Sequence, residues 1–338
     1  MDKKEEKSGK KKLSKIQLRT IIVASIAFAV ALSLIITNVF IPVKYLSSYI
    51  VIRNKGADAG VMRVRFVDVG YGDCTVIELP DGKNIIIDGG NGSASNQSRI
   101  LKYLNSCDID VIDYLVCTSV SAEHCGGLSE IMKFKTVKTV FMPYCLNSYI
   151  TDAFRKFTLS ANKSGAELKI SEYGEFVVNA EYGYSFKILS PSVHSNPMGE
   201  YEQLIQNPTS QYAIDNSSAV VWLEYAETSF LFAGDVRDSV LEGICNSYDL
   251  LLDEYPAELE NCNILKVPNH GNEFSSCSRL YELLKPELAV ISVGENGDGC
   301  PSQTVLSNAA KYVGDNLYRT DVHGTVTIQV TSDGYKVV

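Results

Sequence analysis

The chain has 338 residues, of which 45% are hydrophobic and 21% charged, a composition that excludes an intrinsically disordered or fibrous protein. Its net charge of −9 is unevenly distributed. The first nineteen residues hold eight Lys and Arg against three Asp and Glu, about +5, which leaves about −14 for the remainder. Such an acidic body argues against general nucleic-acid binding, which depends on Lys and Arg at the phosphates.

The nine cysteines are scattered without a CxxC or zinc-ribbon spacing, and their odd number excludes complete intrachain pairing. We expect most of them to be small core residues, as Cys117 and Cys262 are within apolar runs.

Residues 20–43 contain no charged side chain and predict one transmembrane helix, since about twenty apolar residues cross a hydrocarbon core of roughly 30 Å. The basic flank at 1–19 puts the N-terminus in the cytoplasm, and everything after Lys44 outside the cell membrane. A cleaved signal peptide is the alternative, but the apolar run is longer than a usual h-region and no clear A-x-A site follows it. A linker at 44–62 then leads to one folded domain at 63–338.

The domain begins with short β-rich segments. Pro80-Asp81-Gly82 predicts a hairpin turn within them. Gly70-Tyr71-Gly72 leads into a strand rather than a helix, which argues against a dinucleotide-binding loop. Strands are predicted at 64–69, 74–79, 84–89 and 113–118, with a helix at 97–104.

The second half repeats the alternation of strands and helices. A hairpin is predicted at 218–225 and 229–234, strands at 263–268 and 288–293, helices at 237–245 and 278–284, a helix whose first turn contains Pro301, and final strands near Leu317 and at 325–330. Two β-rich halves that each carry helices predict an α/β (α+β) fold of two packed sheets with helices outside, an αββα sandwich.

Six segments follow one another along the chain: RVRFVDVGYGDCTVIELPDGKNIIIDGG, LVCTSVSAEHCGGL, SSAVVWLEYAETSFLFAGDV, ILKVPNHGN, AVISVGENGDGCPS and YRTDVHGTVTI. In this order they resemble the extracytoplasmic metallo-β-lactamase domain of ComEC-type competence proteins. The resemblance covers residues 63–338 and implies the metallo-β-lactamase fold, with one or two Zn²⁺ or Mn²⁺ ions at the sheet edges and hydrolase ancestry.

The family's ligand positions are only partly retained. His124, Asp235 and His270 match them, and Glu123 stands for the usual aspartate. The resemblance further implies roles for Asp73 and Asp88 around the ligands.

Other ligand positions are substituted. Ser119, Ser121 and Asn269 stand where histidines are usual, and Cys300 stands at a fourth. A neutral serine hydroxyl is a poor zinc ligand, and four histidines in the whole chain cannot rebuild the set elsewhere. His194 and His323 are expected on the surface.

Three hypotheses remain open. The first is a membrane-anchored, non-catalytic protein that binds an external protein, polymer or nucleic acid, in which His124 and His270 only hydrogen-bond Asp235. The second is a phosphodiester hydrolase with a single Zn²⁺ or Mn²⁺ on His124, His270, Asp235 and Glu123, with Cys300 as a weaker ligand. The third, which the resemblance implies, is a part in DNA uptake, although one anchor helix cannot form a DNA pore.

Overall fold

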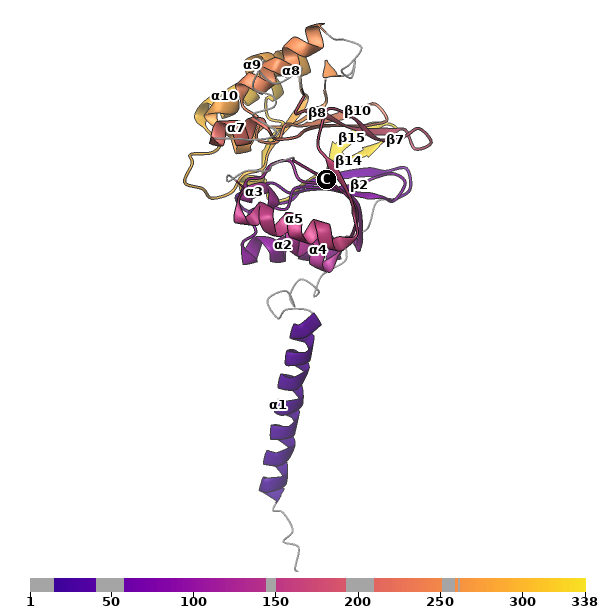
Figure 1. Cartoon of the computed structure of the whole chain (residues 1–338), viewed down its shortest axis with the longest axis vertical. Helices are drawn as coiled ribbons and strands as arrows, with labels where there is room; N and C mark the ends of the chain where they lie inside the picture. The colour runs from indigo at the N-terminus through magenta and orange to yellow at the C-terminus, as the bar shows by residue number, and fades with distance from the viewer. Residues whose placement is uncertain (1–14, 41–57, 144–149, 193–209, 251–258, 261) are drawn as a thin grey trace, which may run out of the picture.

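The computed structural model describes residues 15–40, 58–143, 150–192, 210–250, 259–260 and 262–338. Two β-sheets lie face to face with helices on both outer sides (Figure 1). The predicted αββα sandwich is therefore confirmed. Among the described residues, strands form one eight-stranded and one seven-stranded sheet.

The first sheet has the order β15-β14-β1-β2-β3-β4-β5-β6. Its antiparallel part brings the last strands beside the first, so the C-terminal hairpin completes the N-terminal sheet. The strands are β1 (Met62–Phe66), β2 (Thr75–Glu78), β3 (Asn84–Ile87), β4 (Val111–Val116), β5 (Thr136–Met142), β6 (Glu167–Ile170), β14 (Val326–Thr331) and β15 (Gly334–Val337).

The second sheet has the order β13-β12-β11-β10-β9-β8-β7. Strands β10 to β13 are parallel, so their carboxyl ends share one edge. The strands are β7 (Gly174–Asn179), β8 (Tyr184–Ser190), β9 (Val220–Tyr225), β10 (Thr228–Phe232), β11 (Ile264–Lys266), β12 (Leu288–Ile291) and β13 (Leu317–Arg319).

The helices form two outer layers, and Figure 1 shows α2, α4 and α5 opposite α8, α9 and α10. The helices are α2 (Ala94–Ser106), α3 (Ala122–Cys125), α4 (Leu128–Phe134), α5 (Asp152–Ser164), α7 (Gln211–Asn216), α8 (Asp238–Leu250), α9 (Ser278–Leu284), α10 (Gln303–Val313) and α11 (Thr320–His323), with short 3-10 turns at η3 (Asn269–Gly271) and η4 (Glu273–Ser275).

One detail of the predicted helices was wrong. Pro301 lies outside α10, because Ser302 is the N-cap and its side chain accepts a hydrogen bond from the Val305 amide. Pro301 precedes the N-cap, and the Ser302 side chain accepts a hydrogen bond from an amide of the first helical turn that has no partner within the helix.

Three apolar layers hold the sandwich together. Alternate residues of both sheets meet between them, where the rings of Phe66 and Phe232 lie 5.9 Å apart. Phe154 and Phe157 of α5 fill the layer under the first sheet, and Trp222 lies under the helices of the second. Each such fully buried side chain contributes about 2–3 kcal/mol through the hydrophobic effect.

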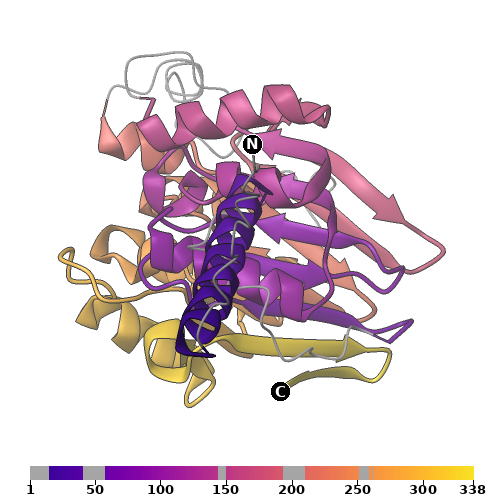
Figure 2. The same cartoon turned by 90° about the horizontal axis from the view of Figure 1, so that it is seen from below.

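A separate helix, α1 (Lys15–Phe40), precedes the sandwich. Its apolar side chains are exposed, Phe28 by 70%, and Figure 2 shows the helix crossing in front of the sandwich when seen from below. Within the described part of the chain, no helix reaches the combined length and hydropathy of a membrane span. Residues 1–14 of the predicted tail and most of the predicted linker lie outside the described residues, while residues 15–19 of the tail form the start of α1.

Candidate metal centre

Six polar side chains converge where the carboxyl ends of the strands meet. Asp88 follows β3, and His124 lies in α3, after the parallel strand β4. Asp235 follows β10, while Lys266 ends β11 and His270 follows it. Asp73 completes the group from the turn before β2. Strands from both sheets thus bring together residues almost 200 positions apart, at the edge where open sheets bind ligands.

Backbone conformation at the site departs from the common regions. Asp88 and His270 have φ of 63° and 52°, which non-glycine residues rarely adopt. Such strain of about 1–3 kcal/mol for each residue is typical of functional sites, where the surrounding structure fixes the backbone. The loops also approach closely, because a Cβ on Gly72 would lie 2.6 Å from the carbonyl oxygen of Glu123.

His124 is held in one orientation by Asp88. Its Nδ1 lies 2.9 Å from Oδ2 of Asp88, whose carboxylate also accepts hydrogen bonds from the amide and hydroxyl of Thr118. An imidazole that donates through Nδ1 presents the lone pair of Nε2 to its other side. That Nε2 lies 2.7 Å from Oδ2 of Asp235.

A different partner holds His270 in an equivalent orientation. Its Nδ1 donates to the carbonyl oxygen of Ser292 over 2.9 Å, so Nε2 faces Asp235 at 3.8 Å. The imidazole centroids of His124 and His270 are 5.3 Å apart, and the Tyr71 ring covers His270 at 4.8 Å. Both imidazoles therefore present Nε2 to one carboxylate.

These atoms suit one metal ion. Nε2 of His270 and Oδ1 of Asp235 are buried without a hydrogen-bond partner, Nε2 of His124 faces the other oxygen of that carboxylate, and the three residues offer ligand atoms within 4.8 Å of one another. Two imidazoles and a carboxylate form a common zinc-binding set. A second group, Asp73, Asp88 and His124, meets the same distance criterion, but His124 Nδ1 is already engaged by Asp88.

A fixed positive charge borders the site. Lys266 is buried and its ammonium forms an ion pair with Asp73, whose other oxygen lies 3.4 Å from Nδ1 of His270. Burial alone would raise the pKa of Asp73, but Lys266 and the histidines reverse this effect and hold that pKa far below its ordinary value. Asp73 is therefore an ionised carboxylate at the centre of the cluster.

Nearby carboxylates favour the protonated form of both histidines. Burial disfavours the charged imidazole of His124, yet Asp235 and Asp88 outweigh it and raise its pKa well above the ordinary value. Burial likewise opposes protonation of His270, whose pKa Asp73 and Asp235 raise. The pKa of Asp235 is lowered, because both imidazoles overcome its burial. Without a metal, the cluster thus balances its acidic groups with Lys266 and imidazolium.

The substituted positions and Glu123 lie outside this set. Ser119 and Ser121 are joined by a hydrogen bond, which the Ser121 amide donates to Oγ of Ser119 over 3.2 Å. Asn269 donates to the backbone oxygen of Asp235 over 3.2 Å and so braces that loop. Within the described residues, neither converging ligand group includes Glu123, and its backbone oxygen accepts from the Asp73 amide.

Cys300 lies outside the converging ligands as well. Its sulfur accepts from the Asn272 side chain over 3.8 Å, and burial raises the pKa of its thiol. Tyr71 and Cys300 are hydrogen-bonded neighbours beside Asp235, so together they cover the cluster. Tyr71, Lys266 and the central position of Asp73 were not predicted from the sequence; a lysine within the apolar run of β11 was the available signal.

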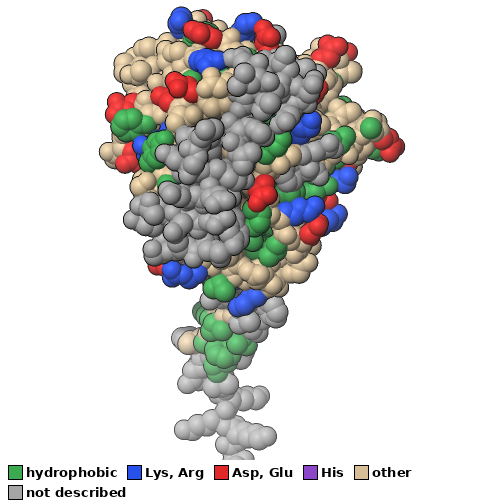
Figure 3. All heavy atoms as spheres, turned by 45° about the horizontal axis from the view of Figure 1, so that its top comes forward, with side chains coloured by type: hydrophobic (Ala, Val, Ile, Leu, Met, Phe, Trp, Pro, Cys, Tyr) green, Lys and Arg blue, Asp and Glu red, His purple; other side chains and the backbone are tan. Residues whose placement is uncertain are grey.

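The other two histidines are not part of the centre. His323 is exposed and accepts a hydrogen bond from the Arg319 amide through Nδ1, as predicted for a surface residue, and His194 lies outside the described residues. On the face drawn in Figure 3, acidic and basic side chains are interspersed and no continuous basic patch is visible.

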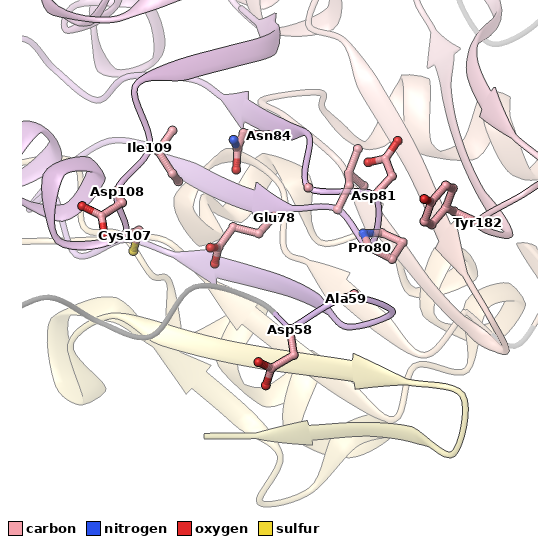
Figure 4. A pocket seen from close by; sticks show the side chains of 12 residues that line it. Asp58, Ala59, Glu78, Pro80, Asp81, Asn84, Cys107, Asp108, Ile109 and Tyr182 are labelled. Carbon is pink, nitrogen blue, oxygen red and sulfur yellow. The ribbon is translucent and has the colours of Figure 1, made fainter.

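An open cavity of about 420 Å³ lies elsewhere, beside β2 and the Pro80 turn (Figure 4). Its acidic groups are engaged within the protein: Glu78 pairs with Arg65, while Asp81 accepts from Lys83 and Tyr184. Histidine and Lys266 are absent from its lining, so it is distinct from the candidate metal centre.

Residues 67–294 match the Metallo-beta-lactamase superfamily, and the chain belongs to that family. It is similar to ComE operon protein 3 of Bacillus subtilis, with 24% identity over 279 residues that make up 78% of this chain and 32% of that protein. It is also similar to Recombination protein 2 of Haemophilus influenzae, with 25% identity over 280 residues, 81% of this chain and 30% of that protein. The chain thus matches about a third of the length of these relatives, and the resemblance to ComEC-type proteins is confirmed.

Solved structures are more distant. CmlA, a diiron beta-hydroxylase from Streptomyces venezuelae, has a TM-score of 0.46 and 10% identity, covering 79% of this chain and 53% of that chain. A metal-dependent hydrolase from Parabacteroides distasonis has a TM-score of 0.41 and 12% identity, covering 76% of this chain and 91% of that chain.

Proposed function

We propose that this chain is a membrane-anchored, extracytoplasmic metallo-β-lactamase-fold protein that acts by binding rather than by turnover. The observation that carries this proposal is the burial of the three converging side chains. His124, Asp235 and His270 are exposed by 0%, 2% and 1% of their surfaces. A substrate would have to reach a metal-bound water beside these three side chains, and their burial supports a centre that is closed to such a substrate.

The lost ligands support the same proposal. With serine at positions 119 and 121, a second metal position has no imidazole, and a two-metal clamp on the attacking and leaving oxygens cannot form. The buried ammonium of Lys266 adds a positive charge next to Asp73, which disfavours a second cation by repulsion. The centre therefore holds at most one metal ion.

A single-metal phosphodiesterase is the second candidate. It is favoured by the convergence of both Nε2 atoms on the Asp235 carboxylate, since the three residues form a three-ligand set. A bound Zn²⁺ or Mn²⁺ would act there as a Lewis acid and lower the pKa of water. His124, His270 and Asp235 would hold the ion, and Asp88 would keep His124 in its ligating tautomer.

The anchor is proposed from residues 20–43. This uncharged run begins in α1, and the exposed apolar side chains of α1 favour an apolar environment. In intact cells that produce the full chain, a membrane-impermeant amine reagent should label exposed lysines of the domain at once. An external protease should digest the domain only after limited unfolding. Labelling that requires cell lysis would contradict the external location.

The partner is proposed to be a protein or an envelope polymer outside the membrane. The acidic body, about −14 after residue 19, disfavours nucleic acid. Two relatives bear names from a competence operon and from recombination, so a part in DNA uptake is a further candidate. Retention of single-stranded DNA at low salt, lost at moderate salt, would favour that candidate.

Hydrolysis of bis-p-nitrophenyl phosphate by the purified full chain, supplied with Zn²⁺ or Mn²⁺, tests the proposal. We expect no turnover above that of Asp235→Asn, with His323→Gln as a matched surface control. Turnover that disappears in Asp235→Asn and persists in His323→Gln would replace our proposal with the single-metal phosphodiesterase.

A further inference from the structure

We infer that Cys245 and Cys277 form a redox-active pair that closes to a disulfide between α8 and the start of α9. The inference rests on the proposed location outside the cytoplasm, because thiols there meet an oxidising environment. Nothing in the candidate metal centre is involved.

The loop before α9 is fastened to α8 next to these cysteines. The Asp238 carboxylate, in the first turn of α8, accepts hydrogen bonds from the backbone amides of Ser276 and Cys277. Cys245 lies seven residues further along the same helix, and positions seven apart share one helix face. The two helices pack against each other in Figure 1 as well. This geometry brings Cys277 onto the face of α8 that carries Cys245.

The two thiols are in direct contact. The thiol of Cys245 donates a hydrogen bond to the sulfur of Cys277. Both side chains are buried in the apolar layer under the second sheet, which also contains Leu280 and Tyr281. Sulfur atoms within hydrogen-bond reach need little movement to form a bond.

Other buried cysteines are engaged differently. Cys117 donates to the Ser119 carbonyl over 3.1 Å, Cys125 to the Val120 carbonyl over 3.5 Å, and Cys262 to the Ile264 carbonyl over 3.4 Å. A thiol that donates to a backbone carbonyl behaves as a small core residue. Cys262 is therefore a suitable control, because it lies in the same apolar layer as Cys245.

The contact also favours reaction at Cys277. The hydrogen bond from Cys245 lowers the pKa of the Cys277 thiol in spite of its burial, whereas burial raises the pKa of Cys262 to about 12. Cys277 is 6% exposed against 1% for Cys245, so a reagent disulfide meets Cys277 first, and thiolate is the nucleophile in disulfide exchange.

The oxidation requires a disulfide reagent, either a small-molecule or a protein disulfide. The Cys277 thiolate attacks one sulfur of that reagent and releases its first thiolate. Cys245 then loses its proton and attacks the Cys277 sulfur of the mixed disulfide, which forms the intramolecular bond and releases the second thiolate. The two cysteines lose two electrons and two protons in total, and the reagent disulfide is reduced to two thiols.

The test maps disulfides in the full chain. Cells are quenched in acid, free thiols are alkylated with N-ethylmaleimide under denaturing conditions, and peptides are identified by mass spectrometry. In parallel, the reduced chain in detergent is equilibrated with oxidised and reduced glutathione. We expect a peptide that links Cys245 to Cys277 in both samples, with Cys262 alkylated, and a melting temperature lowered by about 5 °C on reduction.

The outcomes distinguish a failure of the proposed cysteine pair from a failure of the proposed external location. A link in glutathione buffer but not in cells supports the pair and contradicts the external location. Absence of the link in both samples overturns the pair and leaves the proposed function intact. Cys277→Ser should abolish the reduction-dependent change in melting temperature, whereas Cys262→Ser should retain it; if both variants retain it, the pair is also excluded.

Discussion

Nε2 of His124 lies 2.7 Å from Oδ2 of Asp235, yet His124 commits its Nδ1 proton to Asp88 on the opposite side of the ring. Asp235 therefore faces a lone pair in the neutral imidazole and a second proton donor in the imidazolium. A metal ion and a proton compete for this one position.

Loss of Asp88 should remove the restraint on His124. Asp88→Asn is expected to weaken Zn²⁺ or Mn²⁺ binding by about 10- to 100-fold, because the second partner of a ligating histidine fixes its ring and tautomer. Competition with a fluorescent chelator measures this change. Asp321→Asn, which alters an ion pair with Arg319 at the surface, is the control and should bind metal as the unaltered chain does. Equal affinity in both variants would show that Asp88 does not orient the ligand.

Lys266 should contribute to folding as the partner of Asp73. Lys266→Met leaves a buried carboxylate with less compensation and should lower the free energy of unfolding by about 3–5 kcal/mol, measured by urea denaturation. Asp73→Asn in addition to Lys266→Met should recover a large part of that loss. A double variant as unstable as the sum of both single variants would contradict a specific ion pair.

Stability without metal should fall on both sides of neutral pH. The raised pKa values of His124 and His270 contribute stability that is complete below their unfolded-state pKa, about 6.5, and is lost as pH rises through their folded values. The lowered pKa values of Asp73 and Asp235 contribute stability that is present above about 3.9 and is lost as pH falls toward their folded values. Urea denaturation across this pH range checks both slopes. His124→Gln should flatten the alkaline slope, and an unchanged slope would exclude imidazolium at that position.

Tyr71 should limit access to the cluster. Its ring covers His270, and truncation in Tyr71→Ala is expected to increase modification of His270 by diethyl pyrocarbonate several-fold. Peptide mapping by mass spectrometry gives the rate, with exposed His323 as the internal standard. If the relative rate at His270 does not change, another side chain closes the site.

The sandwich was predictable from the sequence because the chain shows hydrophobic periodicity and carries its motifs in a fixed order. Apolar runs such as residues 84–89 and 229–234 indicate buried strands directly, since β3 lies within the first and β10 shares residues 229–232 with the second. Helix ends were less predictable: Pro301 occurs before the cap of α10, since Ser302 caps more effectively than proline.

The site was only partly predictable, because position in a motif does not determine side-chain direction. His124, Asp235 and His270 come together as predicted, whereas the carboxylate of Glu123 joins neither converging group. Asp73 lies centrally although its motif suggested an outer role, since the turn at Gly70 and Gly72 brings its carboxylate to Lys266 and His270. Long-range ion pairs of this kind depend on the folded arrangement of loops from both sheets.

Metal stoichiometry is the most direct measurement. The full chain, purified without chelator at neutral pH, is compared with His270→Gln and with the surface control His323→Gln by inductively coupled plasma mass spectrometry. The account predicts no more than one equivalent of zinc or manganese in the unaltered chain and in His323→Gln, and loss of that metal in His270→Gln. Two equivalents per chain, or metal that persists in His270→Gln, would contradict a centre reduced to His124, Asp235 and His270.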